Sequence, residues 1–443
     1  MKFLIKTLGC KVNQVESAYI FERLKEKGFF PAESEKETEL FIINSCAVTE
    51  NAYKEAKKIL KKISKFKPRA VIFTGCASIV YAQELKTLAE FLKIPHFLIL
   101  GQREKFELES YLENLESLPE IYEGISSDLT TCYPLLLKEF HGHSRAFVKI
   151  QDGCSSFCSY CIVPYTRGPS RSLPEEYIFR QIEVYLSQGY EEIVLTGIHL
   201  GMWGEDLKPK RKLSELLFKI EEYLKTWKKP LHLRLSSLEV YEIDEDFLSF
   251  AKESQFLCPH FHIPLQSGSN NILKKMNRRY LREEYLEKLN QLFKLFPLAT
   301  FGADILVGFP GEGEKEFLET CEVVEVSPLN WLHIFPFSPR PNTPAEKMKE
   351  RVPKEEIKER ISHLRNLHSQ KRKNFLLKNL GTIRSAILEE ELPNGFSALT
   401  DNYITLWIEL TKDAKKLNLS ARKIVNVELK EILNDNTIKA ELV

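Results

Sequence analysis

The sequence contains no uninterrupted apolar run of about 18 residues, the length that a membrane-spanning helix requires. Its N-terminus also lacks the short apolar stretch of a secretory signal peptide. With neither segment, and with an ordinary hydrophobic content of 43%, we expect a cytoplasmic protein without a membrane partner. The 443 residues give room for about three domains.

A strong charge of either sign is also missing, because 63 basic and 62 acidic side chains leave a net charge of +1. The charges are nevertheless unevenly distributed. Seven lysines lie between Lys54 and Lys67 against the single acid Glu55, whereas residues 102–130 are mainly acidic. The lysine run is suited to binding a polyanion, although a solvated helix face would have the same composition.

The nine cysteines are an odd number, which argues against a disulfide framework and for a reducing compartment. Cys154, Cys158 and Cys161 follow an apolar run with the spacing Cys-x3-Cys-x2-Cys. Four thiolates close a four-iron cluster, so three would leave one iron open to a small molecule. The alternative is a zinc site with His141 or His143 as a fourth ligand, but an expected strand separates these histidines from the loop.

The spacing of these three cysteines resembles the signature of the radical S-adenosylmethionine (SAM) enzymes. In that family the amine and carboxylate of SAM occupy the open iron. The resemblance therefore implies a 4Fe-4S cluster on Cys154, Cys158 and Cys161, with SAM as a cofactor.

Three further cysteines follow strand-like runs in the first part of the chain. The runs at 2–8, 40–44 and 70–74 lead into Cys10, Cys46 and Cys76, and each is followed by a helical pattern. Parallel strands place their carboxyl ends at one edge of a sheet, so we expect these thiols to be neighbours in space. The alternative is three small buried cysteines without a shared role.

The segments at 7–17, 44–49 and 74–77 resemble the N-terminal domain of the methylthiotransferases, which carries a second 4Fe-4S cluster on these three cysteines. Gly-Cys-Lys-Val-Asn-Gln at 9–14 resembles the branch that acts on threonylcarbamoyladenosine in tRNA. The branches that act on isopentenyladenosine or on a ribosomal protein usually carry other residues after the first cysteine.

The central part contains six strand-like runs that alternate with helical segments, at 145–150, 192–196, 231–236, 260–264, 300–307 and 330–335. A count of six strands favours the partial (βα)6 barrel of radical SAM enzymes over a closed eight-stranded barrel. Short alternating runs after Leu380 predict a small five-stranded OB-like barrel that resembles a TRAM domain. We therefore predict an α/β chain with an open parallel N-terminal domain (1–112), a linker (113–139), a radical SAM core (140–371) and a TRAM domain (372–443).

Chemistry in such barrels collects at the carboxyl ends of the strands. We expect Thr196 and Gly197 to approach the amine of SAM and Arg234 and Ser236 to approach its carboxylate. The adenine edge would meet the segment Gly308, Phe309 and Pro310. The resemblance assigns these positions to SAM, although each could also be a strand-end turn.

The resemblance implies a transferase that adds a methylthio group to carbon 2 of N6-threonylcarbamoyladenosine at position 37 of tRNA. In the family, a deoxyadenosyl radical from SAM activates the base, and the second cluster carries the sulfur. An electron donor such as a flavodoxin or ferredoxin and a sulfur donor are implied as partners. The alternatives are isopentenyladenosine in tRNA or a ribosomal-protein side chain as the acceptor.

Overall fold

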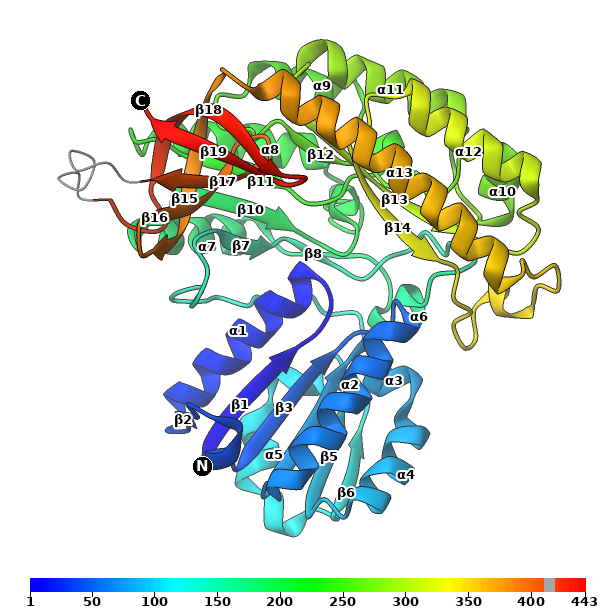
Figure 1. Cartoon of the computed structure of the whole chain (residues 1–443). Coiled ribbons are helices and arrows are strands. Elements are labelled where there is room, and N and C mark those ends of the chain that lie inside the picture. Colours follow the sequence, from blue (N-terminus) through cyan, green and yellow to red (C-terminus); the bar gives the residue numbers. More distant parts are fainter. Residues whose placement is uncertain (410–418) are drawn as a thin grey trace. The chain divides into compact units, whose positions relative to one another are not determined.

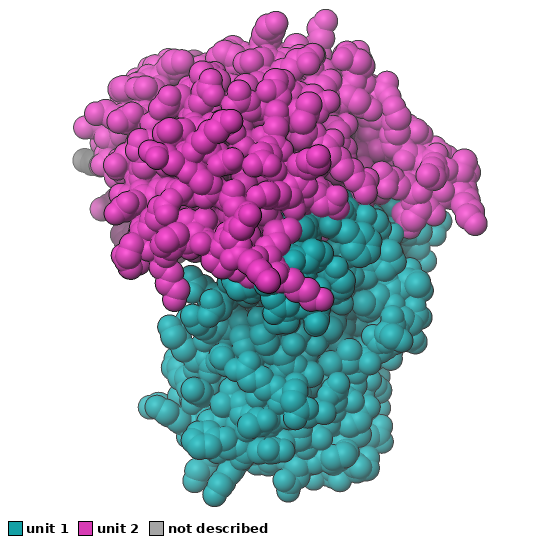
Figure 2. Space-filling model, turned by 90° about the vertical axis from the view of Figure 1, so that its right-hand side faces the viewer, with its two compact units in different colours: residues 1–141, 149–177, 338–346 teal, residues 142–148, 178–337, 347–443 magenta. Residues whose placement is uncertain are grey.

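The computed structural model describes residues 1–409 and 419–443. These residues form two compact units, coloured separately in Figure 2. The first comprises residues 1–141, 149–177 and 338–346, and the second comprises residues 142–148, 178–337 and 347–443. All six cysteines of the two predicted cluster sites therefore belong to the first unit. Within the described residues, no helix combines the length and apolarity needed to cross a membrane.

A six-stranded parallel sheet forms the centre of the first unit, in the order β2-β1-β3-β4-β5-β6 (Figure 1). Its strands are β1 (Lys2–Thr7), β2 (Phe30–Pro31), β3 (Leu40–Ser45), β4 (Ala70–Gly75), β5 (His96–Leu100) and β6 (Ile121–Gly124). Every residue of β3 and β4 is buried, as expected for apolar runs covered on both faces. This confirms the predicted open parallel α/β domain.

Helices cover both faces of this sheet because alternate residues of each strand point to opposite sides. The helices are α1 (Lys11–Glu26), α2 (Glu50–Ile63), α3 (Cys76–Val80), α4 (Ala82–Leu92) and α5 (Leu108–Glu113). Phe41 and Ile43 share one core with α2 and α4, whereas Leu40 and Ile42 share the other with α1 and α5.

The predicted linker is part of the first unit. Strand β6 lies inside residues 113–139 and pairs with β5, and Leu137 and Phe140 are buried. A short edge strand with one neighbour leaves no sustained sequence pattern, which explains why the segment was predicted as a connector. The N-terminal domain therefore extends past residue 112.

The loop with the second set of cysteines is closed at its base by two short antiparallel strands. Strand β8 (Gln151–Asp152) pairs with β9 (Arg171–Ser172), and α6 (Val163–Arg167) lies between them in sequence. The backbone N–H of Cys154 donates to the carbonyl of Gly168 at 3.1 Å, which also draws the ends of the loop together.

The second unit contains all six predicted strands of the partial barrel. They form the sheets β11-β10-β7 and β12-β13-β14, with parallel pairing of β10 with β11 and of β13 with both neighbours. The strands are β7 (Ala146–Lys149), β10 (Glu192–Thr196), β11 (His232–Leu235), β12 (His260–His262), β13 (Thr300–Val307) and β14 (Trp331–Pro336). The accompanying helices are α7 (Glu175–Ser187), α8 (Leu213–Lys225), α9 (Glu245–Glu253), α10 (Asn270–Lys275), α11 (Arg282–Leu295), α12 (Glu314–Val326) and α13 (Lys354–Asn379).

The C-terminal residues form the predicted small barrel, closed in the order β15-β16-β17-β19-β18. Its strands are β15 (Ile383–Leu392), β16 (Gly395–Thr400), β17 (Thr405–Glu409), β18 (Ile424–Asn434) and β19 (Thr437–Leu442). Phe375 and Leu376 of α13 pack into the barrel core. The predicted boundary at 371/372 therefore falls inside α13.

Within the second unit, Arg234 fastens the small barrel to β10 and β11. Its guanidinium pairs with both oxygens of Glu192, at 2.7 and 3.1 Å, and donates to the backbone carbonyls of Thr400 and Asp401. Burial opposes ionisation of Glu192, but Arg234 and His232 hold the pKa of this carboxyl well below its usual range. The expected contact of Arg234 with SAM is not supported, since four of its five donors are engaged here.

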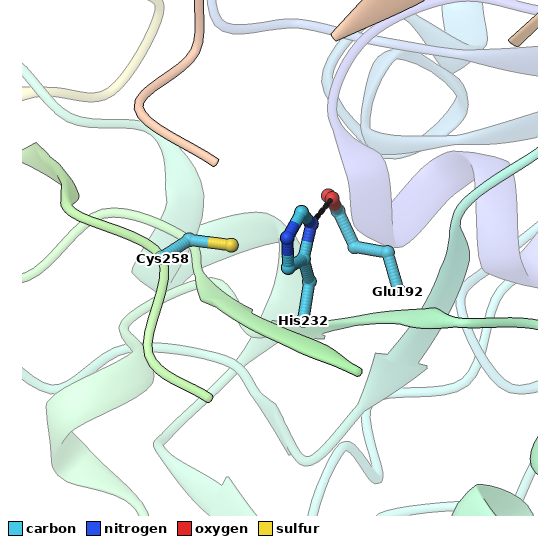
Figure 3. Close-up of side chains that lie close together, drawn as sticks. All are labelled: Glu192, His232 and Cys258. Carbon is cyan, nitrogen blue, oxygen red and sulfur yellow. Dashed lines mark hydrogen bonds and ion pairs between the residues drawn. The ribbon is translucent and has the colours of Figure 1, made fainter. Parts of the chain in front are cut away.

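Figure 3 shows Glu192 and His232 beside Cys258, and potential metal-binding atoms of these three residues all lie within 4.8 Å of one another. His232 uses both ring nitrogens, contacting Glu192 at 3.1 Å and the hydroxyl of Ser385 at 2.6 Å. Arg234 already pairs with both carboxylate oxygens of Glu192. We therefore interpret Glu192, His232 and Cys258 as a docking contact for the C-terminal barrel.

We expect Arg234→Met to weaken this docking by about 3–5 kcal/mol, because the buried Glu192 carboxylate would lose its main partner. Hydrogen exchange of strand β16 and urea unfolding of the metal-free protein measure the effect. Arg211→Met is the matched control, since the pair of Arg211 with Glu215 is exposed and worth about 0.3–0.5 kcal/mol. Equal effects of the two substitutions would contradict the docking role.

Candidate metal centres

Cys10, Cys46 and Cys76 lie at the carboxyl ends of three neighbouring parallel strands. Cys10 caps the start of α1 after β1, Cys46 follows β3, and Cys76 begins α3 directly after β4. The strands are adjacent in the order β1-β3-β4, so the three thiols meet at one edge of the sheet. Cys10 is exposed whereas Cys46 and Cys76 are buried, which leaves the group open on one side.

Two glycines allow the backbone to approach closely at this edge. Gly9 has a φ of +106°, and a Cβ added there would lie 2.8 Å from the Cβ of Cys46. Gly75 has a φ of +91°, and its added Cβ would lie 2.2 Å from the carbonyl oxygen of Ser45. Both positions therefore require glycine, for backbone conformation and for space.

Each of the three sulfurs has one polar neighbour from the surrounding chain. Cys10 lies 3.6 Å from the side-chain oxygen of Asn13, while Val48 N–H contacts Cys46 at 3.4 Å and Gln102 Nε2 contacts Cys76 at 3.5 Å. Burial raises the pKa of the Cys46 thiol to about 12, so metal binding would have to displace its proton. Three such thiols, with donors to two of the sulfurs, fit an iron–sulfur cluster.

Cys154, Cys158 and Cys161 lie together in the loop between β8 and β9. Gly153 has a φ of +69°, and a Cβ there would lie 2.0 Å from the carbonyl oxygen of Pro169, so the two ends of the loop touch. Phe157 also has a positive φ, of +49°, just before Cys158. A loop folded back in this way can present three thiolates to one cluster.

The zinc alternative gains no support from His141. Its Nδ1 lies 3.2 Å from Glu139, and its ring packs edge-on against Phe21 of α1. Among the described residues, the possible metal-binding atoms of Glu192, His232 and Cys258 lie within 4.8 Å of one another. Neither cysteine triad is as compact as this group. Thiolates of a cubane bind different irons, so they need not converge on one point.

Comparison with known proteins relates both parts of the chain to families. Residues 148–324 match the radical SAM superfamily, and residues 2–94 match the uncharacterized protein family UPF0004. The threonylcarbamoyladenosine tRNA methylthiotransferase MtaB of Aquifex aeolicus is 36% identical over 94% of this chain and 99% of its own length. The MtaB enzyme of Bacillus subtilis is 34% identical over 92% of this chain and 90% of its own length.

The chain belongs to the tRNA methylthiotransferase family of radical SAM enzymes. A tRNA-2-methylthio-N6-dimethylallyladenosine synthase from Carboxydothermus hydrogenoformans is also 36% identical, over 83% of each chain. Among solved structures, the radical SAM methyltransferase TsrM of Kitasatospora setae has a TM-score of 0.55 at 13% identity, covering 78% of this chain and 74% of its own. That similarity concerns the fold alone.

The positions expected to bind SAM in this methylthiotransferase occupy strand ends in the second unit. Thr196 ends β10, Gly197 follows it, and Ser236 follows the parallel neighbour β11, so these three residues share one edge. The buried hydroxyl of Ser236 has no hydrogen-bond partner among the described residues, as expected of a group that meets a ligand. Arg234, one residue earlier, is directed to Glu192 and the barrel instead.

Gly308, Phe309 and Pro310 follow β13, in the other sheet of this unit. Gly308 has a φ of +79° and donates its N–H to Glu312, which pairs with Arg360 at 2.7 Å. Phe309 is buried and packs edge-on against Phe337. Glu312 and Arg360 thus support this turn, a role that no local sequence pattern indicated.

The first unit also contains a buried ionic group that no local sequence pattern indicated. Arg167, at the end of α6, pairs with Glu16 of α1 through both terminal nitrogens, at 2.9 and 3.1 Å, and with Asp152 at 2.9 Å. Lys105, Lys149 and Arg171 complete the group. We call these six residues the buried ionic group. Arg167 and Arg171, which follow the cluster loop in sequence, are both buried in ion pairs.

We expect Gly9→Ala to lower the iron bound after anaerobic reconstitution from about eight toward about four atoms per chain, because the new methyl group would displace Cys46. An iron assay measures the loss. Gly28→Ala is the control, since Gly28 has a similar φ of +82° but nothing within 4 Å of an added Cβ. Equal iron content in the two variants would show that close packing against Cys46 is unimportant.

Proposed function

We propose that this protein adds a methylthio group to carbon 2 of N6-threonylcarbamoyladenosine at position 37 of tRNA. The observation that carries this proposal is the similarity to the Aquifex aeolicus MtaB enzyme along 99% of that enzyme's length. The two cysteine triads, both in the first unit, support the requirement for two 4Fe-4S clusters.

Each triad has a distinct role in this proposal. Cys154, Cys158 and Cys161 would hold the cluster that binds SAM, and Cys10, Cys46 and Cys76 would hold the cluster that supplies sulfur. These cofactors provide the radical chemistry that inserts sulfur at an unactivated aromatic carbon, which side chains cannot perform. The exposure of Cys10 supports access of a sulfur donor or substrate to the second triad.

Thr196, Gly197 and Ser236 would bind the amino-acid part of SAM, and the turn at Gly308, Phe309 and Pro310 would border the adenine. The buried hydroxyl of Ser236, which has no partner in the described part of the chain, supports its assignment to the SAM carboxylate. Because Phe309 packs into the protein core, we assign the adenine contact to the backbone of the turn and not to its ring. A flavodoxin or ferredoxin as electron donor, a sulfur donor and a cytoplasmic location complete the proposal.

The second candidate substrate is dimethylallyladenosine at the same tRNA position. The Carboxydothermus hydrogenoformans synthase supports it with equal identity, but over 83% of this chain compared with 94% for the Aquifex aeolicus enzyme. The names of these relatives specify tRNA substrates, which favours tRNA over a ribosomal-protein side chain.

We expect the reconstituted enzyme to convert tRNA bearing threonylcarbamoyladenosine to its methylthio form much faster than tRNA bearing dimethylallyladenosine. Mass spectrometry of the digested nucleosides measures both products. Changing Cys154, Cys158 and Cys161 to Ala should abolish SAM cleavage, whereas changing Cys10, Cys46 and Cys76 to Ala should spare cleavage but abolish methylthio product. The opposite substrate preference would favour the second candidate, and normal product from either variant would contradict the assignment of its triad.

The lysine run provides a candidate surface for tRNA on α2 and the turn that follows it. Several of its members are already paired, including Lys57 with Glu84 and Lys62 with Glu35. Lys61, Lys65 and Lys67 are exposed and make no ion pair with any described residue. These three lysines are therefore the members that remain available for phosphate groups.

We expect changing Lys61, Lys65 and Lys67 to Glu to weaken tRNA binding and to reduce its salt slope by about 0.9 units per lost phosphate contact. Fluorescence binding titrations at several salt concentrations measure the slope. The matched control changes the exposed residues Lys25, Lys36 and Lys93 to Glu, which alters the net charge equally. The same loss of slope in both triple variants would indicate a general charge effect instead of a binding surface.

A further inference from the structure

The buried ionic group connects chain segments that carry both cysteine triads. Glu16 lies on α1, the helix that Cys10 caps, and Asp152 lies two residues before Cys154. Arg167 ends the short helix that follows Cys161, and it contacts both carboxylates. All six side chains in the group belong to residues that are at most 6% exposed, so water screens their charges poorly.

The charges of this group do not cancel. Four cations, on Lys105, Lys149, Arg167 and Arg171, face two anions, on Glu16 and Asp152, which leaves an excess of two positive charges. The exposed carboxylate of Asp128 adds only a minor attraction for Arg171. Burial lowers the pKa of Lys105, whereas the attraction of Glu16 raises it. The effect of burial is the larger, so the pKa of Lys105 is lowered. An uncompensated buried charge is costly unless a negative partner is present.

Two side chains connect the cations of this group with the N-terminal thiols, and one of them, Gln102, donates to a sulfur. The oxygen of Asn13 accepts from Arg167 at 2.6 Å and also lies 3.6 Å from the sulfur of Cys10. Gln102 contacts the sulfur of Cys76 through its nitrogen, while its oxygen accepts from the ammonium of Lys105. Arg167 also interacts electrostatically with Cys10, Cys46 and Cys76.

The local sequence explains why α1 can serve both the thiol and the ion pairs. Cys10, Asn13 and Glu16 recur every three residues, so they lie along one side of the helix. The helix is fixed on the sheet by Asn44 of β3, which donates to the carbonyl of Asn13 and to the hydroxyl of Ser17. Asn13 also donates to the carbonyls of Leu8 and Ser45, next to Cys46.

We propose that the excess positive charge of the buried ionic group is the counter-charge of the cluster on Cys10, Cys46 and Cys76, and that it raises the reduction potential of that cluster. The inference rests on the proposed function, because it requires a cluster at this triad. Three thiolates and a 4Fe-4S core that carries two positive charges leave one net negative charge at the site, and one-electron reduction adds another. Nearby buried cations favour the more negative, reduced form, since net charge and hydrogen bonding set the potentials of such clusters. Lys105 and Arg167 are therefore positioning residues that act through charge.

The test uses the full chain with Cys154, Cys158 and Cys161 changed to Ala, so that only the N-terminal cluster remains. Lys105→Met removes one cation, Glu16→Gln removes one anion, and Arg167→Lys keeps the charge while losing the forked geometry. An electron paramagnetic resonance titration with dithionite and mediator dyes measures the midpoint potential of each variant. Arg23→Gln is the control, because Arg23 lies on the same helix but pairs with Glu109 in a partly exposed position.

We expect Lys105→Met to lower the ratio of reduced to oxidised cluster at least tenfold at a fixed potential, a shift of about 59 mV to more negative values. Glu16→Gln should shift the potential in the opposite direction, whereas Arg167→Lys and Arg23→Gln should shift it far less. Shifts of the same sign for Lys105→Met and Glu16→Gln would overturn the inference, since loss of structure alone does not depend on the sign of the removed charge. Unchanged potentials in both variants would also overturn it.

Iron content separates this inference from the proposed function. If the protein without Cys154, Cys158 and Cys161 retains about four irons and the potentials do not respond to charge, only the inference fails. If that protein binds no cluster at all, the assignment of Cys10, Cys46 and Cys76 fails instead. Circular dichroism of each variant before titration excludes those that do not fold.

Discussion

The ion pair between Glu16 and Arg167 joins residues that are 151 positions apart in the sequence. It fastens the loop with Cys154, Cys158 and Cys161 to the helix that begins at Cys10, and both side chains are fully withdrawn from water. Both partners also pair with other members of the buried ionic group, Glu16 with Lys105 and Arg167 with Asp152, so this contact holds the loop as part of a network.

A second constraint is the shared edge of the parallel sheet, and it was predictable from the sequence. Strands β3 and β4 are continuous apolar runs that lead directly into Cys46 and Cys76, so their pattern gave both the strands and the meeting of the thiols. The six strands of the central part and the closed C-terminal barrel were predictable for the same reason, since each has a local pattern of apolar residues. The methylthiotransferase family could also be identified from these motifs.

Other features had no local pattern to reveal them. Strand β6 has a single neighbour and only four residues, so an acidic connector and an edge strand look alike in sequence. Arg234 lies near the end of strand β11, where a ligand contact was expected, but its partners Thr400 and Asp401 are more than 160 residues away. Glu16, the partner of Arg167, is similarly remote in the sequence. The sequence alone does not distinguish an arginine that forms a buried ion pair beside a cluster loop from one that binds a phosphate group.

The charge balance of the first unit links folding to cluster loading. Without a cluster, the buried ionic group holds two more cations than anions, and burial, together with the repulsion of Arg167, lowers the pKa of Lys105. Any negatively charged group bound at Cys10, Cys46 and Cys76 would relieve this imbalance, so it would bind the folded unit more tightly than the unfolded chain. Binding that prefers the folded state stabilises it by mass action. The same residues that favour a reduced cluster would therefore also make the metal-free unit less stable than the loaded one.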